Sequence, residues 1–332
     1  MNPVQKELLR QLSDGELHSG TALGEQLGIS RAAVWKQLQL LHSFGVEINS
    51  EHRQGYRLSH PVSFLDSGKI EQWLVPHLRP RLPVVETMWG CDSTNSELMR
   101  RLHDGAEIGS VLLAEHQTAG RGRRGKGWVS PFGSSLYLSL LWRFPGGPMT
   151  LSGLSIVVGI AVAETVREYG LVDVQLKWPN DIYLQGRKLG GVLIDLEGEA
   201  EGPTSVVIGI GLNVEISQQS GQTIDQPWIS LAEQMSLSPS RNQLAAALLN
   251  RLVPLLDRFQ QGGMVPFIGE WDNLDRIRNH PVTLQLGEKT VHGVARGVDH
   301  MGALQVETNG VIQRYFSGDV SVRPVRSKRE TA

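Results

Sequence analysis

The stretch Thr118-Ala119-Gly120-Arg121-Gly122-Arg123-Arg124-Gly125-Lys126-Gly127-Trp128 has the strongest chemical character in the chain. Four glycines and four cationic side chains lie within its last nine residues. Apolar residues at 111–114 precede it, so we expect the loop to follow a buried strand. Glycine lets backbone N–H groups turn inward without a Cβ, and arginine offers a fixed fork of donors for phosphate or carboxylate. The stretch is therefore predicted to bind an anion.

Two common phosphate-binding motifs match these letters but not their structural requirements. Gly120-x-Gly122-x-x-Gly125 spells the dinucleotide fingerprint, which must open a helix, whereas Pro131 follows and opposes a helix. A P-loop needs Ser or Thr after its lysine to hold Mg²⁺, and Gly127 stands there. A doubly wound nucleotide-binding sheet and a generic ATPase are therefore disfavoured. A solvated basic loop is the structural alternative.

A second cluster, Lys177-Trp178-Pro179-Asn180-Asp181, makes that alternative less attractive. It follows residues 172–176, which alternate polar and apolar as in a strand. Pro179 cannot continue a central ladder, so the strand is expected to end there. A lysine at a strand end is often only a surface charge. Beside an arginine-rich loop, Lys177 is better explained as a compact cation for phosphate or for a developing negative charge.

Composition sets broad limits on fold and function. The chain of 332 residues is long enough for two or three domains, and 40% hydrophobic and 20% charged residues are typical of a globular protein. The formal net charge of −2 gives no overall basicity. The single cysteine, Cys91, excludes an intrachain disulfide, suits a reducing compartment and is expected to pack as a small hydrophobe. No signal-peptide pattern or membrane span is expected, which favours the cytoplasm.

The first 60 residues have the pattern of a winged helix-turn-helix. Apolar residues at helical spacing predict helices on both sides of the short turn Gly28-Ile29-Ser30. Ser30 is a favourable N-cap for the third helix. Two short strands are expected at 46–48 and 56–58. DNA binding is a hypothesis here, because three-helix units also serve as plain interaction modules.

The candidate DNA contacts lie at the start of the third helix and on the wing: Ser30, Arg31, Trp35, Lys36, Gln37 and Arg53. We expect Trp35 to be half-packed. Residues 1–60 contain six Lys or Arg and six Asp or Glu, so their charges cancel. Because phosphate neutralisation supplies most non-specific affinity, one copy should bind DNA weakly. A dimer that reads two half-sites should bind better.

The rest of the chain predicts α+β architecture. Strands joined largely by hairpins and a buried helix at 151–169 indicate a mixed sheet backed by helices. A second helix at 243–259 is expected to bend or break at Pro254. Thr94 and Glu97 fit a capping box at a helix start. Residues 217–227 read as a mobile loop.

Two further features complete the pattern. Gly209-x-Gly211-x-Asn213 closes a strand, where glycines permit either close backbone approach to a ligand or a bulge. Four short strands between 281 and 317 predict a small C-terminal β-barrel. The last residues, from Arg323, read as a solvated basic tail.

Three motifs together resemble the biotin–protein ligase family: the loop Gly120 to Gly125, the cluster Lys177 to Asp181, and Gly186-Arg187-Lys188-Leu189-Gly190-Gly191. The resemblance extends over nearly the whole chain, including a start like that of the bifunctional ligase/repressors of biotin operons. It implies a class II synthetase-like biotin/lipoyl ligase fold with an SH3-like C-terminal domain. The expected domains are 1–60 for DNA binding, 63–268 for catalysis and 271–326 at the C-terminus.

The resemblance implies an ATP-dependent enzyme that forms biotinyl-5'-AMP and transfers biotin to a lysine of a biotin carboxyl carrier protein. It also implies repression of biotin-synthesis genes at an operator, with the adenylate as corepressor. ATP with Mg²⁺ and biotin would be substrates, and no dedicated metal cluster or permanently bound cofactor is expected. A homodimer would form on adenylate binding, with residues 188–196 as a candidate edge strand.

The resemblance also implies the residues of the site. Lys177 would bridge carboxylate and α-phosphate oxygens, and Arg123 would hold and retain the intermediate. The biotin and adenylate contacts would be Ser93, Thr94, Asn95, Gln117, Gly120, Arg121, Gly122, Arg123, Arg124, Lys177, Gly209, Gly211, Asn213 and Trp228.

Two rival functions remain compatible with parts of the sequence. A lipoate–protein ligase shares the fold and the chemistry, but the arginine-rich loop combined with residues 177–181 favours biotin. A non-catalytic biotin-sensing repressor would bind its effector through a degenerate ligase domain. Retention of every candidate cation argues against such decay.

Overall fold

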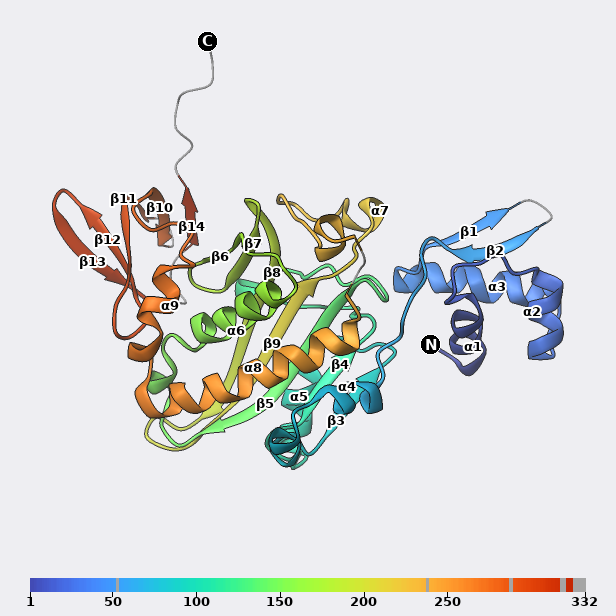
Figure 1. Ribbon diagram of the computed structural model, residues 1–332, viewed down its shortest axis with the longest axis horizontal. Helices are drawn as coiled ribbons and strands as arrows, with labels where there is room; N and C mark the ends of the chain where they lie inside the picture. Colours follow the sequence, from blue (N-terminus) through green and yellow to red (C-terminus); the bar gives the residue numbers. More distant parts are fainter. Residues whose placement is uncertain (52–53, 237–238, 287–288, 317–320, 325–332) are drawn as a thin grey trace, which may run out of the picture.

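A computed structural model describes residues 1–51, 54–236, 239–286, 289–316 and 321–324. The N-terminal helices and their hairpin lie at one end of the molecule, and the C-terminal strands lie at the other (Figure 1). A seven-stranded sheet with its helices occupies the middle. The predicted α+β order of three successive parts is confirmed.

The N-terminal part is a winged helix-turn-helix, as predicted. Its elements are α1 (Pro3–Leu12), α2 (Gly20–Leu27), α3 (Arg31–Leu41), the 3₁₀ turn η1 (His42–Phe44), and the antiparallel strands β1 (Ile48–Glu51) and β2 (Gly55–Leu58). The Ser30 hydroxyl accepts from Ala33 N–H and caps α3. Gly28 ends α2 in the left-handed region, with φ of 65°. Leu8, Leu12 and Leu38 are among the side chains of its small core.

The central sheet has the strand order β3-β4-β5-β9-β8-β7-β6. Only β3 and β4 pair in parallel among the described strands. The strands are β3 (Val85–Met88), β4 (Val111–Ala114), β5 (Ser135–Phe144), β6 (Val174–Lys177), β7 (Asp181–Leu184), β8 (Arg187–Gly198) and β9 (Thr204–Asn213). This mixed, hairpin-rich order rules out a doubly wound sheet, in agreement with the sequence analysis. The four-residue strand β7 was not predicted separately.

Helices cover both faces of this sheet. The helical segments are α4 (Ser67–Trp73), η2 (Pro76–Arg81), α5 (Thr94–His103), η3 (Arg123–Gly125), η4 (Pro148–Leu151), α6 (Leu154–Glu168), α7 (Gln218–Gly221), η5 (Leu231–Gln234), α8 (Arg241–Gly262), η6 (Val265–Phe267) and α9 (Ile268–Asp272). The long helices α6 and α8 pack together on one face (Figure 1). Leu98 of α5 packs on the other face with Leu112, Leu141 and Val207.

The two long helices were both predicted, with one alternative now excluded. Helix α8 continues through Pro254, so the alternative of a break there is wrong; the neighbouring side chains Leu252, Val253, Leu255 and Leu256 are all buried, and this packing outweighs the missing hydrogen bond. The buried helix predicted at 151–169 is confirmed as α6, which begins three residues later than expected, after the 3₁₀ turn η4. The segment Pro148–Glu168 is long and apolar enough to cross a membrane, but most of its apolar window is buried inside this fold.

The C-terminal part is a five-stranded antiparallel sheet of order β13-β12-β11-β10-β14. Its strands are β10 (Pro281–Leu286), β11 (Lys289–Val298), β12 (Leu304–Thr308), β13 (Val311–Tyr315) and β14 (Ser321–Pro324). Strand β14 includes Arg323, where a solvated tail was expected to begin; residues 325–332 lie outside the described residues. The indole Nε1 of Trp178 donates to Gly302 O over 3.0 Å, which joins this sheet to the end of β6.

A buried ion pair fastens α8 to the central sheet. Arg241 and Glu115 are 5% and 4% exposed, and Arg241 Nη1 lies 2.7 Å from Glu115 Oε2. Arg241 also donates to Ser63 O, and Glu115 Oε1 accepts from Leu65 N–H. The pair therefore also holds the segment that leads in from the winged domain.

Removing one member of this pair should destabilise the central domain strongly. Arg241→Ala leaves the Glu115 carboxylate buried without its cation, which costs about 3–5 kcal/mol. Arg251→Ala is the matched control, because Arg251 lies on the same helix and pairs with Glu164 in a partly exposed position, worth about 0–1 kcal/mol. In urea unfolding, the unfolding free energies of the two variants should differ by more than about 2 kcal/mol. Equal unfolding free energies would contradict this account.

Candidate functional site

One cleft of about 1220 Å³ lies on the α5 side of the sheet. The arginine-rich loop, the start of α5, the β6–β7 turn and residues 223–228 form its walls. The side chains and glycines predicted for the substrate site all line it: Ser93, Thr94, Asn95, Gln117, Gly120, Arg121, Gly122, Arg123, Arg124, Lys177, Gly209, Gly211, Asn213 and Trp228. The structure therefore brings together segments that lie up to 135 residues apart in the sequence.

The arginine-rich loop folds back on itself as a small hairpin. Gly122 N–H donates to Lys126 O over 2.7 Å, and Trp128 N–H donates to Gly120 O over 2.8 Å. Arg124 adopts a left-handed conformation with φ of 56°. No regular α-helix begins at this loop, so it is not a dinucleotide fingerprint, as predicted.

The floor of the cleft depends on two glycines of β9. A Cβ on Gly209 would lie 2.1 Å from Asn95 Oδ1, and one on Gly211 would lie 2.7 Å from the Trp128 ring. Both strand pairings of β9 keep a continuous register here, so the alternative of a bulge is wrong. The glycines let Asn95 and Trp128 lie directly on the sheet.

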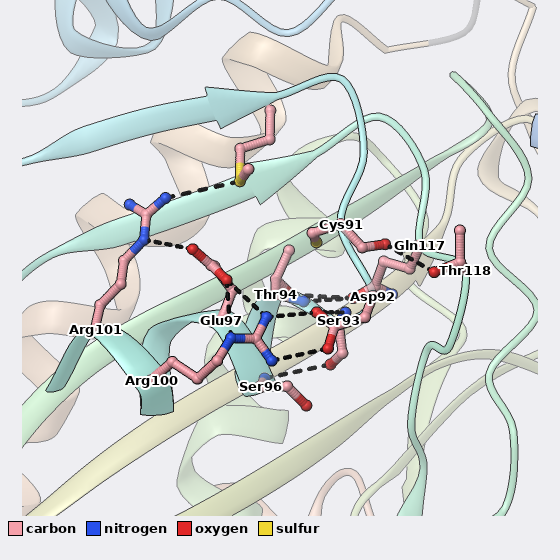
Figure 2. A network of polar contacts seen from close by, with 11 residues as sticks. Cys91, Asp92, Ser93, Thr94, Ser96, Glu97, Arg100, Arg101, Gln117 and Thr118 are labelled. Carbon is pink, nitrogen blue, oxygen red and sulfur yellow. Dashed lines mark hydrogen bonds and ion pairs between the residues drawn. The ribbon is translucent and has the colours of Figure 1, made fainter. Parts of the chain in front are cut away.

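The start of α5 forms an uncharged wall. The N-cap is Ser93, whose hydroxyl accepts from Ser96 N–H, and not Thr94 as predicted. Thr94 is the first helical residue instead, and its N–H and hydroxyl both donate to Gln117 Oε1, over 2.8 and 3.2 Å (Figure 2). Glu97 pairs with Arg100 and does not close a capping box.

Two residues behind this wall, neither of which lines the cleft itself, were not predicted from the sequence. Ser139 of β5 is fully buried and lies 2.6 Å from Asn95 Oδ1 and 2.7 Å from Thr94 Oγ1. Asp195 of β8 accepts from Asn95 Nδ2 over 3.0 Å and from Arg121 Nη2 over 2.6 Å. The signal available in the sequence was a serine on β5 and a carboxylate on β8, the two strands that pair with the glycines of β9.

The part of the cleft formed by the arginine-rich loop and by β6 and β8 is a cationic wall. Six cationic side chains line the cleft against two carboxylates: Arg121, Arg123, Arg124, Lys126, Lys177 and Lys188 against Asp181 and Asp225. This local excess contrasts with the net charge of −2 for the whole chain. Burial lowers the pKa of Arg123, whose Nη1 donates to Asn180 Oδ1 over 3.5 Å. Lys177 Nζ lies 5.7 Å from the Tyr183 ring centroid.

Lys188, which belongs to the motif Gly186 to Gly191, also lines the cleft, and no individual role was predicted for it. Its Nζ lies 2.7 Å from Asp181 Oδ1 and 5.6 Å from the Trp128 ring centroid. Its side chain is only 15% exposed. Lys188 therefore lies between the β6–β7 turn and the arginine-rich loop, deeper than a surface charge.

Residues 217–227 were predicted as a mobile loop and contain the short helix α7. The hydroxyls of Ser217 and Ser220 both donate to Glu47 Oε1 of the winged domain. A Cβ on Gly221 would meet the Trp228 ring at 2.0 Å, so the loop packs tightly on that indole. One end of this segment therefore touches the winged domain and the other lines the cleft.

The candidate DNA contacts gather on one helix. Arg31 and Lys36 are exposed on α3. Trp35 is 54% exposed, so about half of its surface is covered, as expected. Gln37 accepts from Asn2 Nδ2 over 3.1 Å, and Arg53 lies outside the described residues.

The described side chains include no group of three or more His, Cys, Asp or Glu placed to hold a metal ion. Cys91 is partly buried near the start of α5 (Figure 2). Burial raises the pKa of its thiol to about 12, which fits the expected packing role better than chemical reactivity.

Comparison with known proteins agrees with this geometry. Residues 91–213 match the biotin/lipoate A/B protein ligase family, residues 4–57 match an HTH domain, and residues 279–323 match the biotin protein ligase C-terminal domain. The bifunctional ligase/repressor BirA of Escherichia coli (strain K12) is 41% identical over 97% of this chain and 98% of its own length. The bifunctional ligase/repressor BirA of Bacillus subtilis (strain 168) is 28% identical over 96% and 98%.

A solved structure is similar as well. The biotin protein ligase from Aquifex aeolicus in complex with biotin and ATP matches with a TM-score of 0.63 and 29% identity. The match covers 73% of this chain and 99% of that one. With this fold, this cleft and these relatives, the chain belongs to the family of bifunctional biotin–protein ligase/repressors.

Proposed function

We propose that the cleft binds biotin against its uncharged wall and ATP against its cationic wall, and joins them. The chain is an ATP-dependent biotin–protein ligase and a transcriptional repressor. Biotin and ATP are its substrates. The observation that carries the proposal for this site is the meeting of six cations with a hydrogen-bonding wall in a single cleft.

The chemistry explains why the cations are needed. A carboxylate is a poor electrophile, so biotin must first attack the α-phosphate of ATP, forming biotinyl-5'-AMP and releasing pyrophosphate. This step brings a carboxylate onto a polyphosphate and collects several negative charges in one place. Fixed cations offset that charge, most of all as it grows in the transition state.

Individual roles follow from position. Lys177 ends β6 and Lys188 lies on β8, the two strands that flank β7. Both line the cleft and would stabilise charge at the carboxylate and the α-phosphate. Arg123, on the loop, would hold the adenylate until it is used. Trp228 and residues 223–227 would cover the nucleotide end, with Asn213 nearby. Mg²⁺ would enter with ATP.

The second step transfers biotin to a lysine of a biotin carboxyl carrier protein, with AMP as the leaving group. The lysine amine attacks the biotinyl carbonyl of the mixed anhydride. Lipoate is the rival substrate because lipoate ligases share the family description. The relatives reported above are biotin ligases, which favours biotin. The reaction is proposed to take place in the cytoplasm.

The function is tested by incubating the purified protein with labelled biotin and Mg·ATP, with and without an apo carrier domain. We expect labelled carrier, and biotin-dependent pyrophosphate release in both mixtures. Biotin binding without turnover would leave a sensor-repressor, and turnover with lipoate alone would overturn the substrate.

The two lysines should be needed for the first step. Lys177→Ala and Lys188→Ala should each slow biotin-dependent ATP–pyrophosphate exchange at least about tenfold, because one lost charge-stabilising contact is worth roughly 2–4 kcal/mol. Lys69→Ala removes an exposed lysine of α4 outside the cleft and should leave exchange unchanged. Near-normal exchange in either cleft variant would refute the role of that lysine.

Repression requires the adenylate to act at a distance, and dimerisation is the proposed means. Among the described strands, only β9 pairs with residues 192–198 of β8. That open edge, where Leu196 is 44% exposed, could pair with the same strand of a second copy. Sedimentation should show a larger species with adenylate than without it.

Operator binding is proposed to use α3. Arg31→Ala and Lys36→Ala should each weaken binding to biotin-operator DNA and reduce its salt dependence, because each would remove a phosphate contact or a base contact. Arg258→Ala removes the same charge from α8, outside the winged domain, and serves as the control. If the footprint and the salt dependence of binding are unchanged in the α3 variants, the DNA contacts do not lie on α3.

A further inference from the structure

The uncharged wall of the cleft is anchored by one carboxylate. Asp195 lies on β8 and its side chain is 23% exposed. Its Oδ2 atom is 3.0 Å from Asn95 Nδ2 and 2.6 Å from Arg121 Nη2. A single oxygen therefore ties the start of α5 to the arginine-rich loop.

This carboxylate determines which way the Asn95 amide faces. A carboxylate only accepts hydrogen bonds, so the NH₂ group of Asn95 must face Asp195. The same NH₂ group also donates to Leu193 O over 3.3 Å. The amide oxygen is thereby turned toward Ser139, above the position where Gly209 carries no side chain.

The constraint continues along the wall. Ser139 has one hydroxyl proton and faces the Asn95 oxygen at 2.6 Å, so it must act as a donor. Thr94 sends its own proton toward Gln117 Oε1 and keeps lone pairs on Oγ1. Acceptors are what the two N–H groups of a cyclic urea require. The arrangement of donors and acceptors that would bind biotin is therefore determined first by Asp195.

These residues belong to separate strands and to one helix, and pairing between neighbouring strands brings them close together. Ser139 of β5 pairs with Gly209 of β9, which pairs with Leu193 of β8. Asp195 follows two residues later, so it projects from the same face as Leu193. Asn95 spans the row from α5 and is only 3% exposed. A nearly buried amide with every partner in place keeps one orientation.

We propose that Asp195 is a positioning residue that sets the donor and acceptor pattern of the biotin wall and holds Arg121 beside it. The inference rests on the proposed function, because it takes this wall as the site of the urea ring. Asp195 acts through Asn95 and Ser139 and not on the reacting atoms. Specificity for the urea group should therefore depend on it.

The test measures, by titration calorimetry, direct binding of biotin and of N1′-methylbiotin, in which a methyl group replaces one urea N–H proton. We expect Asp195→Ala to weaken biotin binding about tenfold, the size of one lost buried hydrogen bond. It should also shrink the preference for biotin over N1′-methylbiotin, while the KM for ATP changes less than about twofold on the same reasoning. Asp195→Asn keeps an acceptor oxygen for Asn95 and should bind biotin better than Asp195→Ala.

Two further variants keep the test decisive. Glu197→Gln alters a carboxylate on the same strand that pairs with His103 outside the cleft, and it should bind both ligands as the wild type does. Ser139→Ala removes the hydrogen bond to Asn95 while Asp195 stays intact, and it should also lose discrimination between the two ligands. It replaces Asp195→Ala as the test if that variant does not fold. All variants are compared at a concentration where sedimentation shows the same oligomeric state.

The outcomes separate this inference from the proposed function. Unchanged biotin affinity and unchanged discrimination in Asp195→Ala would overturn the positioning role, while biotin binding by the wild type would stand. A wild-type protein that binds no biotin would overturn the proposed function and this inference with it.

Discussion

Close approach of side chains to the backbone of β9 is the constraint on which the cleft depends. Gly209 and Gly211 leave room for Asn95 and Trp128 to lie on the sheet. Any side chain at these two positions would push both residues into the space that a ligand needs. The uncharged wall and the arginine-rich loop can therefore take these positions only because Gly209 and Gly211 lack a Cβ atom.

The same arrangement places the charges on rigid supports. Lys188 lies on β8, Lys177 ends β6, and the arginines belong to a hairpin loop closed by its own backbone hydrogen bonds. Cations held this way need little reorganisation when charge develops on a ligand. The winged domain contacts the cleft segments as well: Glu47 accepts from Ser217 and Ser220, and a Cβ on Gly45 would meet Pro131 at 3.2 Å. The winged domain is thus packed directly against segments that adjoin the cleft.

Much of the fold and of the candidate site could be predicted because local patterns carried the information. Glycine-rich and proline-containing ends of strands marked the loops, and Ser30 marked a helix start that the structure confirms. What failed depended on tertiary contacts. Ser139 lies inside an apolar strand, so its role becomes visible only when Gly209 exposes it to Asn95. Pro254 is tolerated because its helix is packed on both sides of it, and Ser93 takes the N-cap one residue before Thr94.

The most direct test of the central claim is whether the cleft makes and keeps an adenylate. The protein is incubated with labelled biotin and Mg·ATP without carrier, then separated from free ligand by rapid gel filtration. The account predicts label that comigrates with the wild-type protein and is released to added apo carrier domain, and little retained label in Arg123→Ala. Free label only, from a wild-type protein that is folded and binds biotin, would contradict it.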